Sequence, residues 1–148
     1  MEKSLKRYLK GGAFTNISPK RSSNMSAIRN KNNKTTELKL RMCLVRASVK
    51  GWQMNVKGIL GQPDIYFDKQ KLAIFIDGCF WHGCPKCGHI PKTRKSFWSA
   101  KFRSNRLRDK KVNCYLMKSG IQVFRIWEHQ LLGSKNIVAV IKKIMGVL

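Results

Sequence analysis

The stretch that most constrains the fold reads Leu72-Ala73-Ile74-Phe75-Ile76-Asp77-Gly78-Cys79-Phe80-Trp81-His82-Gly83-Cys84-Pro85-Lys86-Cys87-Gly88-His89. Its first part is a short apolar run with branched and aromatic side chains, which is typical of a buried β-strand. Its second part is rich in Cys, His and Gly and predicts an irregular loop. We therefore expect a strand over residues 71–76 that ends in a metal-binding loop.

The loop carries three cysteines within nine residues: Cys79, Cys84 and Cys87. Thiolates and imidazoles bind Zn²⁺ tetrahedrally, and the C-x2-C spacing is common for one ligand pair. The candidates for the fourth ligand are His82, His89 and His129. We favour His129, because it follows a predicted strand and could return to the same end of the sheet. His89, which lies close in sequence, is the alternative.

The predicted elements outside this stretch alternate between helices and strands. We expect a helix from Thr35 to about Gly51, and strands over 52–56, 64–67 and 121–127. Further helices are expected over 96–119, with Ser96 as the cap, and over 134–147. The runs 64–67 and 71–76 are close enough for a hairpin or two neighbouring strands. This order predicts an α/β fold, with a mixed β-sheet flanked by helices.

The charge of the chain is strongly one-sided. It has 31 Lys and Arg residues against 7 Asp and Glu residues, a net charge of +24. A polyanion relieves the self-repulsion of such an excess, and nucleic acid is the first candidate. Between Lys86 and Lys111 there are ten basic residues and one acid. On a helix these residues form a positive surface suited to DNA phosphates.

Length and hydropathy indicate one monomeric domain without a membrane span. The chain has 148 residues, of which 43% are hydrophobic, and no apolar stretch approaches the roughly 20 residues that a span needs. The N-terminus is basic but lacks an apolar segment, so we expect no secretion signal. Because the cysteines are clustered and no export signal is expected, we expect the protein to lie in the reducing cytoplasm. A DNA-binding protein there would be associated with the nucleoid.

Two of the few acids lie at the ends of predicted neighbouring strands. Asp64 precedes one strand and Asp77 ends the next, so the two carboxylates could share one Mg²⁺ ion. An Asp that follows a Pro is also a common turn residue. If His129 binds zinc, His82 becomes a candidate general base. A loop histidine bonded to backbone is the alternative.

The chain resembles the very short patch repair (Vsr) family of DNA mismatch endonucleases. The resemblance runs from about Arg21 to Leu132, and the block from Phe75 to His82 is its most specific part. The other matching segments are 21–28, Glu37, 61–64, 91–98, 105–109 and 123–128. The resemblance divides the chain into a basic flexible arm over 1–20 and a Vsr-like endonuclease domain over 21–148.

The resemblance implies a restriction-endonuclease-like core with a structural zinc, and Mg²⁺-dependent nicking beside the T of a T:G mismatch. Double-stranded DNA with this mismatch would be the substrate, and other mismatch repair proteins are candidate partners. Asp64 matches the catalytic aspartate that binds Mg²⁺. Glu37 matches an acid that assists the metal through water, and His82 matches the histidine that activates water.

Three aromatic residues match those that wedge into the DNA stack beside the mismatch: Phe80, Trp81 and Trp98. Unstacking a mismatched step is less costly than unstacking a paired one. Packing into the core is the alternative role for these rings. One departure from the family is Asp77, which stands where a histidine can occur. The second metal contact is therefore Asp77 itself or the backbone carbonyl of Ile76.

The positive charge and the predicted zinc ligands also fit two other functions. One is a non-catalytic zinc-containing DNA-binding protein, and the other is a restriction-like nuclease of the same fold. A binding protein has no need of the set Asp64, Glu37 and His82, so these three residues favour the nuclease.

Overall fold

Four strands form one mixed sheet in the order β1-β2-β3-β4 in a computed structural model that describes residues 36–148. The strands are β1 (Trp52–Met54), β2 (Ile65–Phe67), β3 (Leu72–Asp77) and β4 (Gln122–Trp127). The first three strands pair antiparallel, and β3 pairs parallel with β4. The α/β prediction is confirmed, including the hairpin of β2 and β3. The predicted arm over 1–20 and the matching segment 21–28 lie outside the described residues.

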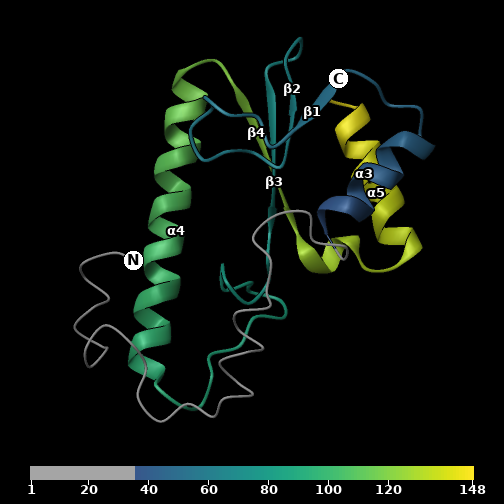
Figure 1. The fold of residues 1–148 in the computed structure, drawn as a ribbon. Helices are drawn as coiled ribbons and strands as arrows, with labels where there is room; N and C mark the ends of the chain where they lie inside the picture. Colours follow the sequence, from purple (N-terminus) through teal and green to yellow (C-terminus); the bar gives the residue numbers. More distant parts are fainter. Residues whose placement is uncertain (1–35) are drawn as a thin grey trace.

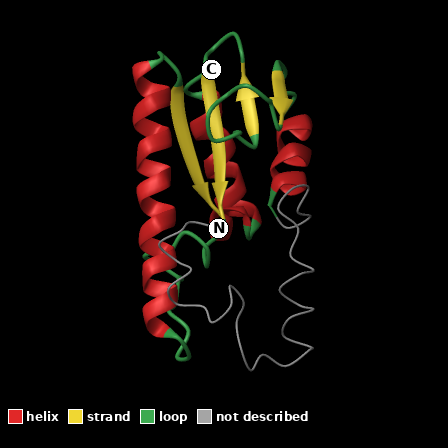
Figure 2. Ribbon diagram, turned by 60° about the vertical axis from the view of Figure 1, so that its left-hand side comes forward, coloured by secondary structure: helices red, strands yellow, loops and turns green. Residues whose placement is uncertain are grey.

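Helices cover both faces of the sheet. The long helix α4 (Lys95–Lys118) lies on one side, while α3 (Glu37–Arg46) and α5 (Ser134–Met145) lie on the other (Figure 1). Parallel strands need a long crossover connection, and α4 supplies it between β3 and β4. Figure 2 shows α4 alongside the sheet and continuing past the ends of β3 and β4. A short 3₁₀ helix, η1 (Glu128–Leu131), which we had not expected, follows β4 directly.

Alternation along the strands separates two hydrophobic clusters. On the α3 and α5 face, the larger cluster contains Ile65, Phe67, Leu72, Ile74 and Ile126 from the strands. The smaller cluster, on the α4 face, contains Tyr66, Ala73, Phe75 and Leu116. Because side chains alternate between faces, Asp64, Asp77 and Arg125 share the face of Tyr66 and Phe75. These charged groups therefore lie beneath α4.

The first helix ends earlier than expected. The prediction extended it to Gly51, but α3 ends at Arg46. Ser48 has φ of 55°, its amide donates to the carbonyl of Val45, and the amide of Val49 donates to that of Leu44. This is the Schellman arrangement, which closes a helix with one left-handed residue. The sequence did not indicate that the helix ends here, because glycine is the usual residue at this position and the chain has serine.

The start of α4 also differs from the expected cap. Ser96 lies inside the first turn, and the N-cap is Arg94, in the left-handed region with φ of 56° and without a side-chain cap hydrogen bond. The amide of Trp98 donates to the carbonyl of Arg94 at 3.2 Å. Phe97, which is buried at 7% exposure, faces the interior from this first turn. Aromatic packing therefore sets this end of the helix.

Alanine at Gly61 is expected to destabilise the fold by about 2–4 kcal/mol. Gly61 has φ of +84°, and a Cβ there would come 2.6 Å from Cγ1 of Val112 on α4. Strain at positive φ costs about 1–2 kcal/mol, and overpacking adds about 1–3 kcal/mol. Gly58→Ala is the matched control, because Gly58 has φ of +94° but nothing within 4 Å. Urea unfolding should show the larger loss for Gly61→Ala; equal losses would exclude the contact with α4.

None of the helices within residues 36–148 is both long and apolar enough to span a membrane.

Candidate active site and metal centre

The sheet topology brings the candidate residues to one end of the sheet, where β3 and β4 finish. The parallel strands β3 and β4 end in register, with Asp77 opposite Trp127. The residues two positions further on, Cys79 and His129, therefore leave the sheet from the same end. Because β2 runs antiparallel to β3, Asp64 enters β2 at this end as well. The cysteine-rich loop and a carboxylate site thus share one end of the sheet.

Three sulfurs and one imidazole meet at this end of the sheet. The Sγ atoms of Cys79, Cys84 and Cys87 lie 3.2, 3.6 and 3.4 Å from Nδ1 of His129. The four ligand atoms all lie within 4.8 Å of one another. Zn–S bonds of about 2.3 Å and Zn–N bonds of about 2.0–2.1 Å at tetrahedral angles place S and N about 3.5 Å apart. The cluster is compatible with a zinc site in both its donor set and its dimensions.

His129, and not His89, stands beside the three sulfurs. His89 is exposed, and its ring lies 5.7 Å from the ring of Phe80. The turn that carries Cys84 and Cys87 is closed by a 2.8 Å hydrogen bond from the Gly88 amide to the Cys84 carbonyl. A Cβ on Gly88 would come 2.5 Å from that carbonyl oxygen, so the turn requires glycine.

The thiols of the cluster are electrostatically unequal. Burial and the neighbouring sulfurs raise the pKa of Cys79 to about 12. Burial alone would also raise the pKa of Cys84, but hydrogen bonds from the amides of Cys87 and Lys86 outweigh it and lower that pKa. Crowded thiolates repel one another, and a divalent cation among them would offset this repulsion. This electrostatic cost fits a metal as the normal occupant.

Asp64 lies partly buried at the start of β2. Its Oδ2 accepts a 2.6 Å hydrogen bond from the amide of Ile76. The pKa of Asp64 is raised to about 6, because burial and the charges of Glu37 and Asp77, which raise it, outweigh the Ile76 amide and Arg125, which lower it. Glu37 is 4% exposed, in the first turn of α3. Asp64 and Glu37 are therefore acids close enough to repel each other.

His82 is held by an acid that the sequence reasoning had not selected. Its Nδ1 lies 2.6 Å from Oδ2 of Asp109 on α4 and 3.6 Å from Oδ1 of Asp77. Burial alone would raise the pKa of Asp109, but the hydrogen bond and charge of His82 outweigh it and lower that pKa. Asp109 falls in a segment that resembles the family, and its position as the one acid of a basic helix was the available signal.

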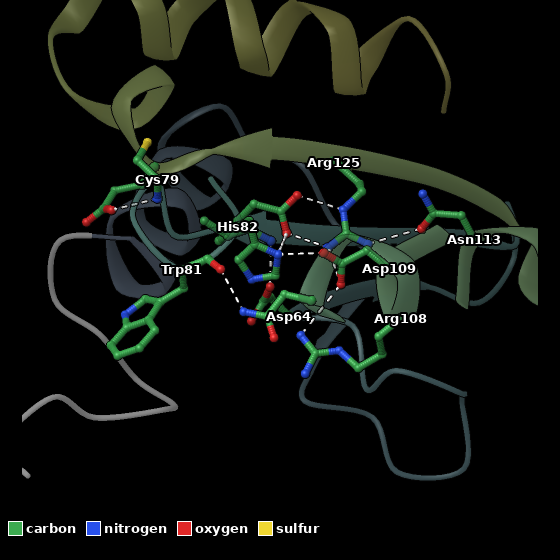
Figure 3. A network of polar contacts seen from close by, with 12 residues as sticks. Asp64, Cys79, Trp81, His82, Arg108, Asp109, Asn113 and Arg125 are labelled. Atoms are coloured by element: carbon green, nitrogen blue, oxygen red, sulfur yellow. Dashed lines mark hydrogen bonds and ion pairs between the residues drawn. The ribbon is translucent and has the colours of Figure 1, made fainter. Parts of the chain in front are cut away.

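Asp77 is engaged by Arg125 of β4. The Nε of Arg125 donates to Oδ2 of Asp77 at 2.6 Å, and a terminal guanidinium nitrogen donates to Oδ1. Figure 3 shows Arg125 within a polar network that includes His82, Asp109 and Asn113. Burial alone would lower the pKa of Arg125, but the hydrogen bonds and charge of Asp77 outweigh it and raise that pKa. The side chain of Asp77 therefore has an ionic partner within the protein.

The three predicted wedge aromatics form one cluster with α4. The ring of Phe80 lies 5.2 Å from Trp81 and 5.0 Å from Trp98. Phe102 of α4, which is 3% exposed, packs beneath Phe80 with ring centroids 5.4 Å apart. The three predicted rings are only partly buried. They are thus neither core residues nor fully exposed, and the ring of Trp81 points away from the polar network (Figure 3).

Two further hydrogen bonds hold the loop in place. The amide of Cys79 donates to Oε2 of Glu128 at 3.2 Å. The side-chain amide of Asn105, which is buried in α4, donates to the carbonyl of Trp81 at 2.6 Å. The loop that carries Trp81 and His82 is therefore fixed to both η1 and α4.

The fold and site define a basic, mixed α/β protein with a Cys₃His cluster, compatible with a metal, beside a carboxylate and histidine site. A family model described as DNA mismatch endonuclease Vsr matches residues 15–89. The DNA mismatch endonuclease Vsr of Escherichia coli K12 is 31% identical over 120 residues, which cover 79% of this chain and 74% of that protein. The chain therefore belongs to the Vsr family.

Other similar proteins are named as nicking enzymes. The type II nicking enzyme V.NaeI of Lentzea aerocolonigenes is 49% identical over 73 residues, 49% of this chain and 44% of that enzyme. The type II nicking enzyme V.HpaIIP of Haemophilus parainfluenzae is 45% identical over 85 residues, 55% of this chain and 59% of that enzyme. The matched segments thus span about half the length of these two relatives.

Proposed function

We propose that this protein is a Mg²⁺-dependent DNA endonuclease that nicks one strand next to the T of a T:G mismatch. The observation that carries the proposal is that Asp64 and His82 lie together at one end of the sheet (Figure 3), with the charge of Glu37 acting on Asp64, beside partly buried aromatic rings and a basic helix. Membership of the Vsr family supports the same activity. We further propose a restriction-endonuclease-like core within residues 21–148, acting as a monomer on DNA in the cytoplasm.

The metal would be held by the carboxylate of Asp64 and the backbone carbonyl of Ile76, with Glu37 acting through water. The donor chemistry fits, because Mg²⁺ takes oxygen ligands and needs only one or two carboxylates. The raised pKa of Asp64 also fits, since burial beside Glu37 makes a cation favourable there. When bound, the ion would neutralise charge on the phosphate and lower the pKa of a coordinated water.

His82 would accept the proton of the attacking water. Asp109 occupies Nδ1 of the imidazole at 2.6 Å, so Nε2 would be the accepting atom. A carboxylate on one ring nitrogen fixes the tautomer and stabilises the imidazolium that forms. Asp109 would therefore orient the base and stabilise its charged form.

DNA would be held by the outer surface of α4 and opened by the aromatic cluster. The exposed basic side chains of this helix include Lys95, Arg103, Arg106, Arg108, Lys110 and Lys111. Such residues bind phosphates and set the register without reading bases. Phe80, Trp81 and Trp98 would insert beside the mismatch, where unstacking costs less than at a paired step. Zinc would keep the loop that carries Phe80 and Trp81 rigid.

The test is nicking of a labelled duplex with one T:G pair, beside the same duplex with T:A. Zinc-loaded protein and Mg²⁺ should produce one nick, in the T strand next to the mismatch. The rate on T:A should be lower by about 10² or more, since one unfavourable step costs a few kcal/mol. Equal rates on the two duplexes would show that the protein nicks DNA without specificity for the mismatch. Binding without any nicking would leave a DNA-binding protein.

A further inference from the structure

Arg125 makes polar contacts with three side chains at the site. Its guanidinium binds both oxygens of Asp77 and lies 3.3 Å from Oδ1 of Asp109. Another of its nitrogens donates to Oδ1 of Asn113 at 3.1 Å. The guanidinium carbon lies 5.0 Å from the centroid of the Phe75 ring. A side chain held at so many points has little conformational freedom.

These contacts join three elements. Asp77 ends β3, Arg125 lies in β4, and Asp109 and Asn113 lie one turn apart on α4. The side chain of Arg125 is only 20% exposed, so its ionic contacts are weakly screened by solvent. Since Asp109 also binds Nδ1 of His82, Arg125 is linked through one carboxylate to the proposed base.

The same contacts bear on the role of Asp77. Both oxygens of Asp77 face a bidentate guanidinium, which uses one lone pair of each oxygen and fixes the plane of the carboxylate. Such a pair matches the planar fork of arginine to a carboxylate and is the strongest common ionic hydrogen-bond geometry. Within residues 36–148, the one group of side chains close enough to enclose a metal is the Cys₃His cluster. Asp77 thus differs from Asp64, whose Oδ2 bonds only a backbone amide.

We propose that Arg125 is a positioning residue, which holds Asp109 and so orients His82, and that Asp77 serves as its partner and not as a ligand of the catalytic metal. This inference rests on the proposed function, because it assigns roles within that site. It leaves Asp64 as the one side-chain carboxylate that ligates the metal directly.

Metal affinity tests the role of Asp77 without relying on turnover. Mn²⁺ binding is measured by electron paramagnetic resonance on the zinc-loaded full chain, in complex with an already nicked T:G duplex. The double variant Asp77→Asn with Arg125→Met removes the pair without changing net charge. It should bind Mn²⁺ within threefold of wild type, while Asp64→Asn should bind at least tenfold more weakly. If the double variant loses affinity as much as Asp64→Asn, Asp77 is a ligand and the inference fails.

Steady-state kinetics on the T:G duplex test the role of Arg125. Arg125→Met should lower kcat at least tenfold with KM within threefold, because His82 is misplaced while the DNA surface is intact. Arg125→Lys keeps the charge but lacks the fork, and should recover only part of kcat. Arg46→Met, an exposed change on α3, is the matched control and should leave both parameters within twofold.

Zinc content and thermal unfolding show whether each variant is folded. Where Arg125→Met does not fold, Arg125→Lys decides: a kcat equal to wild type overturns the positioning role, and a reduced kcat at unchanged KM supports it. A folded Arg125→Met with wild-type kcat also overturns that role. Nicking by Asp64→Asn at the wild-type rate would instead refute the proposed function itself, so the two failures are distinguishable.

Discussion

Asparagine in place of Asp64 is expected to lower the nicking rate by about 10³-fold or more while DNA binding is retained. The metal's charge stabilisation of a transferring phosphate contributes several kcal/mol, and each 1.36 kcal/mol is a tenfold change in rate. Asn keeps the size of Asp64 and an oxygen that can accept from the Ile76 amide, which lies 2.6 Å away in the wild type. The loss should therefore appear in the chemical step, measured as the single-turnover rate at saturating protein.

The same substitution is expected to stabilise the protein at neutral pH when Mg²⁺ is absent. Burial raises the pKa of Asp64 from 3.8 to about 6, so between these values the folded state binds more protons than the unfolded state. Stability conferred by this group therefore falls as pH rises from about 4 to 6 and stays lower above that range. About two pKa units at about 1.4 kcal/mol each set an upper limit of about 3 kcal/mol.

Thermal unfolding of the zinc-loaded protein in buffer without Mg²⁺ measures this effect. Asp64→Asn should have the higher Tm at pH 8, by about 3–10 °C for a chain of this length. The difference should vanish near pH 4, where Asp64 is protonated in the folded state. A variant no more stable than wild type at pH 8 would show that the carboxylate of Asp64 is not penalised by burial.

Removal of zinc is expected to unfold the loop between β3 and α4 and to abolish nicking. Binding of zinc to small Cys and His sites contributes on the order of 10 kcal/mol, and here the ligands enclose the loop that carries Phe80, Trp81 and His82. The exposed Lys86, Lys92 and Lys95 should become rapid trypsin sites in the zinc-free protein. Zinc content by mass spectrometry and the rate of proteolysis measure the effect.

Two histidine variants distinguish His129 from His89 as the fourth zinc ligand. His129→Ala should lose zinc and open the loop, because Nδ1 of His129 lies within 3.6 Å of all three sulfurs. His89→Ala should keep one zinc per chain, since that ring lies beside Phe80 instead, tilted at 53° with centroids 5.7 Å apart. Loss of zinc from His89→Ala together with its retention in His129→Ala would contradict the ligand set.

The fold could be predicted because most of its signals are local. The apolar run 71–76 and the alternation in 121–127 mark β3 and β4, and the basic segment between them had to cross over as a helix. The end of α3 could not be predicted, because closure at Ser48 depends on backbone geometry that glycine normally marks. The start of α4 was likewise displaced by the packing of its aromatic first turn.

The candidate site could also be predicted only in part. The spacing of Cys84 and Cys87 was visible in the sequence, and His129 was a reasonable fourth ligand because it follows a predicted strand and could return to the same end of the sheet. The network around Arg125 was not visible, because Asp77 and Arg125 are 48 residues apart and Asp109 meets them only after α4 packs on the sheet. The available hints were Arg125 among the apolar residues of β4 and Asp109 as the one acid of α4.

The central claim, that Asp64 holds a metal over the scissile phosphate, is tested most directly by single-turnover nicking with matched occupancy. Wild type and Asp64→Asn are loaded with zinc, bound to the labelled T:G duplex to the same extent, and mixed with Mg²⁺. Wild type should give one nick beside the T, and the variant should react at a rate at least about 10³-fold lower. Nicking by Asp64→Asn within tenfold of the wild-type rate would contradict this claim.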